Sequence, residues 1–465
     1  MKQHYLKNIN WPNFGYSNTP PQIPLKEYER RLKECNELLE KHNLTHLVIY
    51  ADREHFANLC YLTGFDPRFE EALMIIRANA KPLVLIGNEC FAYLDASPLI
   101  QEHKIRKELF QTFSLLNQPR DKSRKLIEIL KDENINSNSK IGCVGTKYFD
   151  SQEFNESQYA IDIPAYLADL LRKLSSYENV INASDLFMHP DYGIRTNVGI
   201  YDIAYLEYTN GLASEGFKNM LFAIKEGVSD FDLAKKMEFN GTPLGCHLTF
   251  VTDSNHKYGL SGPNGSLIKK GSVLASNFCY WGANICRAGW VVNNENELPP
   301  QANDYIQKFA GKYFEVMNEW FKSMKPEILG GEIFDLIHKN LPFETFGIYL
   351  NPGHLIHLDE WISSPIYKNS KIKLRSGMAM QVDIIPCSEN YFSTRMEDGI
   401  VIADTALQAN LLAAFPEVFK RCKTRKEFMN QTLGFELPEA VLPLSNMTGI
   451  VNPFFLNPNL VFALK

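Results

Sequence analysis

Five polar side chains stand in otherwise apolar segments of the second half of this 465-residue chain, and their types could support hydrolytic chemistry. They are Asn277, Asn284, His354, Asp383 and Glu397. Asn is depleted in β-strands, so two of them on neighbouring predicted strands indicate a polar cavity. A lone Asp in the apolar run AMQVDIIP is costly to bury unless it is paired or holds a ligand. We therefore expect these five side chains to face one pocket.

His354 and His357 lie three residues apart in the segment NPGHLIHLDEW. Such a pair can be two structural imidazoles bonded to the backbone, or part of a site. The motif around the pair favours a functional role for His354. Glu397 and Asp398 follow Arg395 in RMED and have an equally simple alternative, an ion pair at the end of a strand.

Other reactive side chains in this region also have a structural alternative. Arg68 and Arg287 have such an alternative, because most arginines are surface or structural residues. The thiols of Cys279 and Cys286 suggest a nucleophile, although a free Cys is commonly buried and inert. The aromatic side chains could form either core or pocket wall; they are Tyr280, Trp281, Trp290 and Trp361.

Composition places the chain among globular proteins and excludes several functions. Hydrophobic residues make up 45% and charged residues 22%. The net charge of −6 offers no electrostatic case for binding nucleic acid. No apolar run is long enough to predict a membrane span. The nine cysteines form no CxxC pair, which is typical of reduced thiols in a cytoplasm.

The order of predicted elements divides the chain near residue 190. Before it, strands and helices alternate, beginning with a helix after Pro24 and a strand at His46–Tyr50, which indicates a sheet covered by helices. The run His189–Gly193 (HPDYG) is a break. After Leu248 strands predominate, with helices between them. We therefore predict an α/β domain over 1–190 and an α+β domain over 191–465.

Four segments in the second half, taken in order and spacing, resemble the "pita-bread" family of creatinase, prolidase, aminopeptidase P and methionine aminopeptidase. The N-terminal half resembles the creatinase-type N-domain. The resemblance implies an α/β N-terminal domain, an α+β pita-bread C-terminal domain and a homodimer. The segments are Gly271–Arg287, Asn351–Trp361, Gly377–Pro386 and Arg395–Asp398, with Tyr61–Phe65 and Pro67–Glu70 in the N-terminal half.

Members of that family place two Asp, one His and two Glu around a pair of divalent metals. In this chain the two Asp positions fall on Asn277 and Asn284, and the His position falls on His354. The two Glu positions fall on Asp383 and Glu397. A neutral amide binds a hard dication far more weakly than a carboxylate does. The resemblance therefore implies no dinuclear centre, and either no metal or a single Mn, Co or Zn on His354, Asp383 and Glu397.

The implied activity is hydrolysis of a C–N bond in a small dipeptide-like (Xaa-Pro) or amidino substrate. His354 would act as general acid or base, and Asp383 or Glu397 would orient it. The alternative is a catalytically inactive relative that binds a peptide or small molecule. Ser261 and Trp361 stand where the family has two further histidines, and they favour that alternative. Substrate-binding candidates are Arg68, Asn277, Asn284, Arg287, His357 and Arg395.

Overall fold

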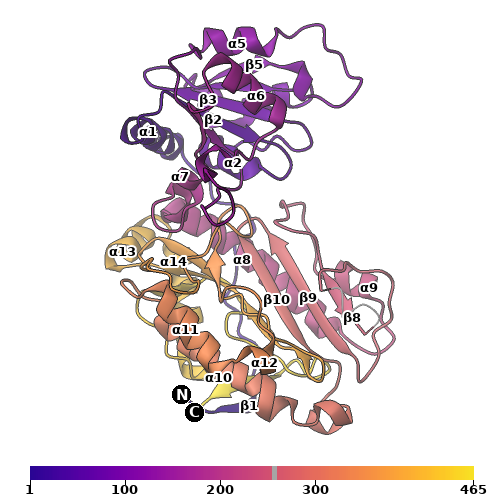
Figure 1. Cartoon of the computed structure of the whole chain (residues 1–465). Helices are drawn as coiled ribbons and strands as arrows, with labels where there is room; N and C mark the ends of the chain where they lie inside the picture. Colours follow the sequence, from indigo (N-terminus) through magenta and orange to yellow (C-terminus); the bar gives the residue numbers. More distant parts are fainter. Residues whose placement is uncertain (254–258) are drawn as a thin grey trace. The chain divides into compact units, whose positions relative to one another are not determined.

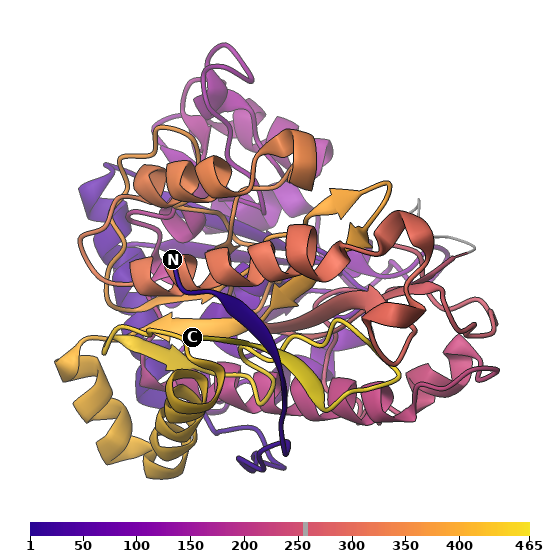
Figure 2. The same cartoon turned by 90° about the horizontal axis from the view of Figure 1, so that it is seen from below.

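The computed structural model describes residues 1–253 and 259–465, and the chain divides into two compact units. One unit is Gln22–Arg195, and the other combines Met1–Pro21 with Thr196–Lys465. This grouping differs from the predicted ranges at the N-terminus. The cause is strand β1 (His4–Asn8), which pairs antiparallel with β18 (Leu460–Leu464), as Figure 2 shows. No local sequence pattern reveals a pairing over that separation. The naming of 1–190 as a creatinase-type domain stays a prediction.

The unit Gln22–Arg195 is built on a six-stranded mixed sheet in the order β5-β4-β3-β2-β6-β7. The antiparallel pair β3–β4 forms a hairpin around Ala78–Ala80. Strands β2 and β3 are almost entirely buried, which matches their apolar sequences. The strands are β2 (His46–Ala51), β3 (Ala72–Arg77), β4 (Leu83–Ile86), β5 (Arg106–Leu109), β6 (Ile141–Val144) and β7 (Val180–Asn182). The helices are α1 (Leu25–Lys41), α2 (Phe56–Thr63), α3 (Cys90–Tyr93), α4 (Pro98–Gln101), α5 (Leu126–Asp132), α6 (Ala165–Leu174) and α7 (Asp185–Met188).

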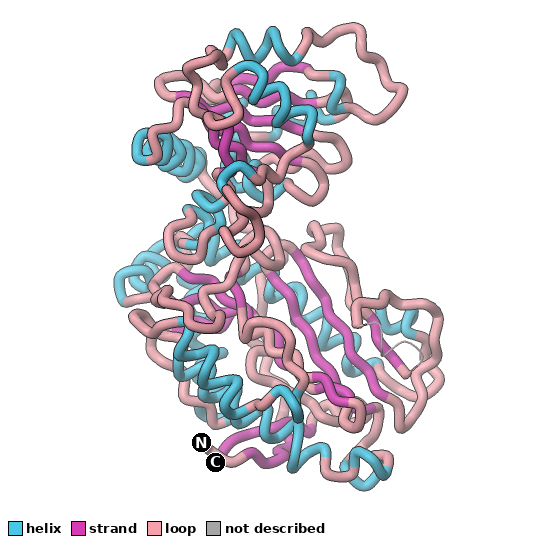
Figure 3. Tube along the Cα trace, viewed as in Figure 1, coloured by secondary structure: helices cyan, strands magenta, loops and turns pink. Residues whose placement is uncertain are grey.

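The second unit contains two four-stranded antiparallel sheets and the helices that cover them (Figure 3). The first sheet, in the order β15-β10-β9-β8, consists of β8 (Phe250–Thr252), β9 (Val273–Tyr280), β10 (Ala283–Trp290) and β15 (Arg395–Glu397). The second, in the order β11-β12-β16-β17, consists of β11 (His354–Leu355), β12 (Met378–Gln381), β16 (Gly399–Ile402) and β17 (Val441–Pro443). Strands β13 (Cys387–Ser388) and β14 (Phe392–Ser393) form a short pair.

The helices of this unit are α8 (Ile200–Ala223), α9 (Asp230–Lys235), α10 (Gly311–Ser323), α11 (Gly330–Asn340), α12 (Phe343–Phe346), α13 (Thr405–Ala414) and α14 (Pro416–Phe428). A π-helical turn at Ile306–Ala310 directly precedes α10. Within 1–253 and 259–465, no helix has both the length and the apolarity needed to cross a bilayer.

The hairpin β9–β10 packs against α8, as seen in Figure 1, and its register decides which side chains share a face. Its loop has only two residues, because Tyr280 pairs with Ala283. Gly282 has a φ of +75°, and a Cβ at this position would lie 2.3 Å from Leu206 Cδ2. A glycine is therefore required at this turn.

Side chains on one face of the hairpin alternate between amide and thiol. Asn277 lies opposite Cys286, and Asn284 lies opposite Cys279. Residues two apart on a strand point to the same side, so these four side chains face the same way. Both strands are fully buried along their length. The hairpin thus presents a buried polar row in an otherwise apolar sheet.

Candidate functional site

A chain of contacts links the two hairpin amides to the acidic end of β15. Asn277 Nδ2 donates to Asn284 Oδ1 at 3.2 Å, and Asn284 Nδ2 donates to Glu397 Oε1 at 2.8 Å. Thr249 fixes the other side of Asn277, because its backbone N–H and its hydroxyl both donate to Asn277 Oδ1. The predicted neighbours Asn277, Asn284 and Glu397 therefore lie together.

His354 and Asp383 complete the predicted set from the second sheet. His354 lies on β11, and its Nε2 is 3.8 Å from Asp383 Oδ2. Asp383 is close enough to Glu397 for its charge to raise the pKa of that carboxyl group. All five of the polar residues that sequence analysis singled out thus lie in one cluster.

Glu360 is a further member of this cluster that sequence analysis missed. Its Oε1 lies 3.4 Å from His354 Nε2, and its side chain is 24% exposed. One ligand atom each from His354, Glu360 and Glu397 all lie within 4.8 Å of one another. The available signal was its place in the acidic run LDEW, six residues after His354.

The carboxylates of the cluster have opposing titration behaviour. Burial raises the pKa of Asp383 to about 6, although His354 opposes the shift. Burial and the neighbouring Asp383 raise the pKa of Glu397 well above its usual range. Burial also acts on Glu360, but His354 outweighs it and holds the pKa of Glu360 below its usual value. Burial therefore favours the neutral form of Glu397 and Asp383, and His354 stabilises the charged form of Glu360.

Two buried atoms of the cluster have no well-formed hydrogen bond to any residue in the described ranges. They are His354 Nε2 and Asp383 Oδ1. The contact of His354 with Glu360 is an ion pair at a length too great for a good hydrogen bond. Burial would lower the pKa of His354, but Glu360 and Asp383 outweigh it and raise that pKa. Buried polar atoms normally have a partner, so these two atoms point to a ligand.

Trp361 and Arg395 border the cluster. The Trp361 indole stacks on the His354 ring with centroids 4.1 Å apart, and it remains 37% exposed. Arg395 Nη2 donates to Ser393 Oγ at 3.3 Å, and Nη1 approaches Cys286 Sγ at 3.6 Å. Among the described residues, Arg395 Nε has no hydrogen-bond partner.

Arg287 is a correction to the predicted set of substrate-binding residues. It is fully buried, and its guanidinium donates to Asp398 at 2.7 Å and to four backbone carbonyls. No donor is left to hold a substrate, because its five N–H groups are committed to the fold. Arg287 instead fixes β10 against β15 and the segment 447–450.

The structure gives His357 and Arg68 other contacts. His357 Nε2 contacts Asp202 of α8 at 3.3 Å. Arg68 belongs to the unit Gln22–Arg195, where it contacts Tyr93 and Asp66. The structure of that unit alone gives Arg68 a local role on an exposed loop, and its predicted substrate-binding role stays a prediction.

No protein-family model and no curated protein matches this sequence. Solved structures match its fold. The prolidase from Pyrococcus horikoshii OT3 is 15% identical with a TM-score of 0.61, over 80% of this chain and 95% of that one. The Xaa-Pro dipeptidase from Bacillus anthracis is 14% identical with a TM-score of 0.61, over 82% and 96%. The X-Pro aminopeptidase from Thermotoga maritima MSB8 is 13% identical with the same TM-score, over 80% and 95%. The chain therefore has the pita-bread fold, as the resemblance predicted.

Proposed function

We propose that this chain is a peptidase-like hydrolase that cleaves a C–N bond in small dipeptide-like substrates of the Xaa-Pro type. We further propose that it binds one divalent metal, Mn, Co or Zn, through His354, Glu360 and Glu397. The observation that supports the proposal is the surplus of buried carboxylate around one imidazole whose Nε2 lacks a hydrogen bond. Burying such charge without a partner is costly.

The donor set suits a single ion. One imidazole nitrogen and carboxylate oxygens are ligands that Zn²⁺ and Mn²⁺ accept. Glu360 replaces Asp383 in the ligand set predicted from sequence, because its carboxylate lies closer to His354 Nε2. Asn277 and Asn284 supply only neutral amides and are already bonded to each other. These two positions therefore supply no anionic ligand for a second ion.

When bound, a divalent ion would polarise the scissile carbonyl and lower the pKa of a water molecule. The remaining roles belong to the side chains. Asp383 is suited to exchange a proton near pH 6, because burial places its pKa there. Arg395 has an uncommitted Nε and would hold the substrate carboxylate. Asn284 would keep Glu397 oriented through its hydrogen bond.

The proposal is tested first by metal content and affinity. Purified protein would be analysed for bound metals and titrated calorimetrically with Mn²⁺, Co²⁺ and Zn²⁺. We expect one ion per chain in the parent. Glu360→Gln should weaken binding at least about tenfold, as loss of an anionic ligand implies. Glu389→Gln is the control, because Glu389 is exposed on the same unit. Two ions per chain, or equal affinity in Glu360→Gln, would refute the proposed centre.

Activity is then measured on Xaa-Pro dipeptides with and without the bound ion, and on amidino compounds for comparison. If the metal-loaded protein turns over neither class of compound, the proposed hydrolase activity is contradicted.

One observation favours the second candidate, a binding protein without turnover. Trp361 covers one face of His354 by stacking, and it cannot carry a proton. Saturable dipeptide binding with no product would establish that candidate.

We also propose a homodimer that works in the cytoplasm. Support for the dimer comes from the resemblance to the pita-bread family, and support for the cytoplasm comes from the unpaired cysteines. Sedimentation of the purified protein tests the first, and a single-chain mass at all concentrations would contradict it.

A further inference from the structure

Two cysteines beside the cluster have neighbouring side chains. Cys246 lies in the loop before β8, and Cys279 lies on β9. Asn277, which shares a face of β9 with Cys279, donates from Nδ2 to Cys246 Sγ at 3.2 Å and so brings the Cys246 thiol to that face. The backbone supports the approach, since Gly245 N–H donates to the Cys279 carbonyl at 3.2 Å. A Cβ at Gly245 would lie 2.8 Å from Cys279 Sγ, so the residue before Cys246 must be small for the two to meet.

The two thiols differ in access and reactivity. Cys279 is fully buried, whereas Cys246 is partly exposed. Hydrogen bonding with Cys279, against the effect of burial, lowers the pKa of Cys246 below its usual value. Burial raises the pKa of Cys279 well above its usual value. An accessible thiol of lowered pKa beside a buried partner is the arrangement of an attacking and a resolving cysteine.

We propose that Cys246 and Cys279 form a reversible disulfide with a low-molecular-weight disulfide, such as oxidised glutathione, as the oxidant. The Cys246 thiolate attacks one sulfur of the oxidant, forming a mixed disulfide and releasing one glutathione thiolate. The Cys279 thiol then attacks Cys246 Sγ and releases the second glutathione, which takes the Cys279 proton. The protein dithiol is oxidised, and one oxidised glutathione is reduced to two thiols.

The disulfide would act on the candidate site through Asn277. In the dithiol form, Cys246 Sγ accepts from Asn277 Nδ2 at 3.2 Å, and the same amide group donates to Asn284. Engaging Cys246 Sγ in a bond to Cys279 removes that thiol from its place beside Asn277. The link Asn277–Asn284–Glu397 then loses one of its fixed ends. The disulfide itself does not depend on the proposed hydrolase activity.

The test uses the full chain, fully reduced, desalted and incubated with oxidised glutathione without oxygen. Free thiols are then alkylated, and peptides are mapped by mass spectrometry. We expect a Cys246–Cys279 disulfide that reduced glutathione reverses. In Cys279→Ser, glutathione should accumulate on Cys246, because the resolving thiol is gone. In Cys246→Ser, Cys279 should stay unmodified.

Cys387→Ser is the matched control, because Cys387 is exposed and should not change the mapped disulfide. The mapping on the parent chain needs no variant to fold. Both thiols remaining free in the parent under excess oxidant, with native circular dichroism, would overturn the proposal. So would a disulfide that joins Cys246 to another cysteine.

Discussion

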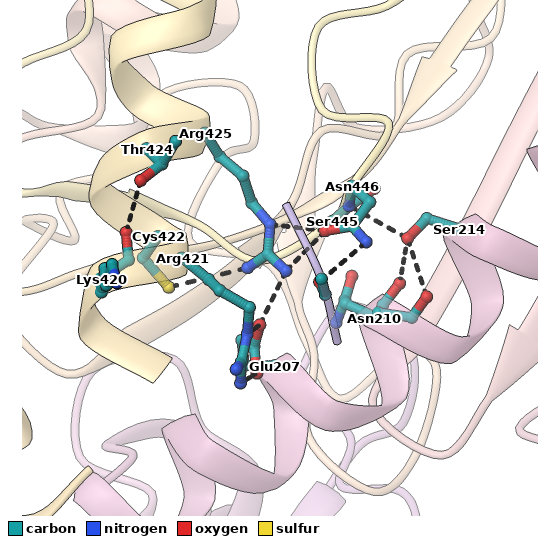
Figure 4. Close-up of polar contacts among 12 residues, drawn as sticks. Glu207, Asn210, Ser214, Lys420, Arg421, Cys422, Thr424, Arg425, Ser445 and Asn446 are labelled. Carbon is teal, nitrogen blue, oxygen red and sulfur yellow. Dashed lines mark hydrogen bonds and ion pairs between the residues drawn. The ribbon is translucent and has the colours of Figure 1, made fainter. Parts of the chain in front are cut away.

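Two buried polar clusters of the same unit differ in how completely their charged groups are paired. In the first, Glu207 of α8 meets two arginines of α14, as Figure 4 shows. Arg421 Nε and Nη2 donate to its two oxygens at 2.8 and 2.6 Å, and Arg425 Nη2 donates at 2.7 Å. Arg425 also donates to Asn446 Oδ1. In the second cluster, which surrounds His354, neither Asp383 Oδ1 nor His354 Nε2 makes a hydrogen bond to a described residue.

The pKa values of the carboxylates express the difference. Burial acts to raise the pKa of Glu207, but Arg425 and Arg421 outweigh it and lower that pKa. Burial raises the pKa values of Asp383 and Glu397, and His354 and Arg395 only partly oppose the rise for Asp383. The Glu207 cluster is thus internally balanced and holds α8 against α14. The site around His354 instead keeps buried carboxyl groups with raised pKa values, which is typical of a place that binds a ligand.

The largest expected effect comes from breaking the balanced cluster. Glu207→Gln leaves the buried guanidinium of Arg425 without its counter-charge, so the free energy of unfolding should fall by about 3–5 kcal/mol. Urea unfolding measures it. Glu439→Gln is the control, because Glu439 is 76% exposed and its lysine pairs are worth under about 1 kcal/mol. Equal losses in both variants would mean that the Glu207 cluster is not a balanced ion pair.

Adding charge to the cluster around His354 should have the next largest effect. The double variant Asn277→Asp, Asn284→Asp replaces a hydrogen-bonded amide pair, 3.2 Å apart, with two carboxylates beside Glu397. Without metal, the free energy of unfolding should fall by about 2–4 kcal/mol. The added carboxylates repel one another, and removing them from water is costly. Mn²⁺ should bind more tightly than in the parent. An unchanged calorimetric affinity would show that these positions do not face the ion.

Removing charge from the same cluster should stabilise the protein. The folded-state pKa of Asp383 is raised to about 6 from its ordinary value of 3.8. The destabilisation that its ionised form causes therefore grows as pH rises from 3.8 and is complete above about 6. In metal-free protein, Asp383→Asn should gain about 1–3 kcal/mol above that range and nothing below pH 4. Thermal unfolding at several pH values measures it. A loss of stability above about pH 6 would contradict an uncompensated Asp383.

A balanced histidine in the other unit gives the smallest expected effect. Hydrogen bonds to Asp162 and Asp52 raise the pKa of His55 to about 9 from 6.5. A raised cationic pKa contributes stability that is present below pH 6.5 and lost as pH rises through about 9. His55→Gln should therefore cost about 1 kcal/mol at low pH and nothing above that range. His42→Gln, at an exposed position, is the control. A pH-independent cost would assign His55 a packing role.

The sequence predicted the residues of the site better than their partners. Asn277, Asn284, Asp383 and Glu397 were identified because a polar residue in an apolar strand is conspicuous. Glu360 escaped notice, since it lies in a polar loop where an acidic residue has no contrast with its neighbours. Its role depends on how that loop folds back on His354, which is a tertiary contact without periodicity.

Two other features show the same limit. The structural role of Arg287 could not be foreseen, because three of its four carbonyl acceptors belong to residues more than a hundred positions away. Cys246 had no sequence partner within a recognisable spacing of Cys279. Strand positions, by contrast, were largely predictable, since alternation and burial act locally along the chain.

The pairing of β1 with β18 has a mechanical consequence. His4 lies opposite Leu464 and Asn8 opposite Leu460, so the N-terminus and the C-terminus of the chain leave the strand pair at the same end. A force that pulls the two ends apart acts across this ladder rather than along it. The hydrogen-bonded pairs would then open one after another instead of sharing the load. We therefore expect the unit to begin unfolding at its termini under a low pulling force, although its interior is densely packed.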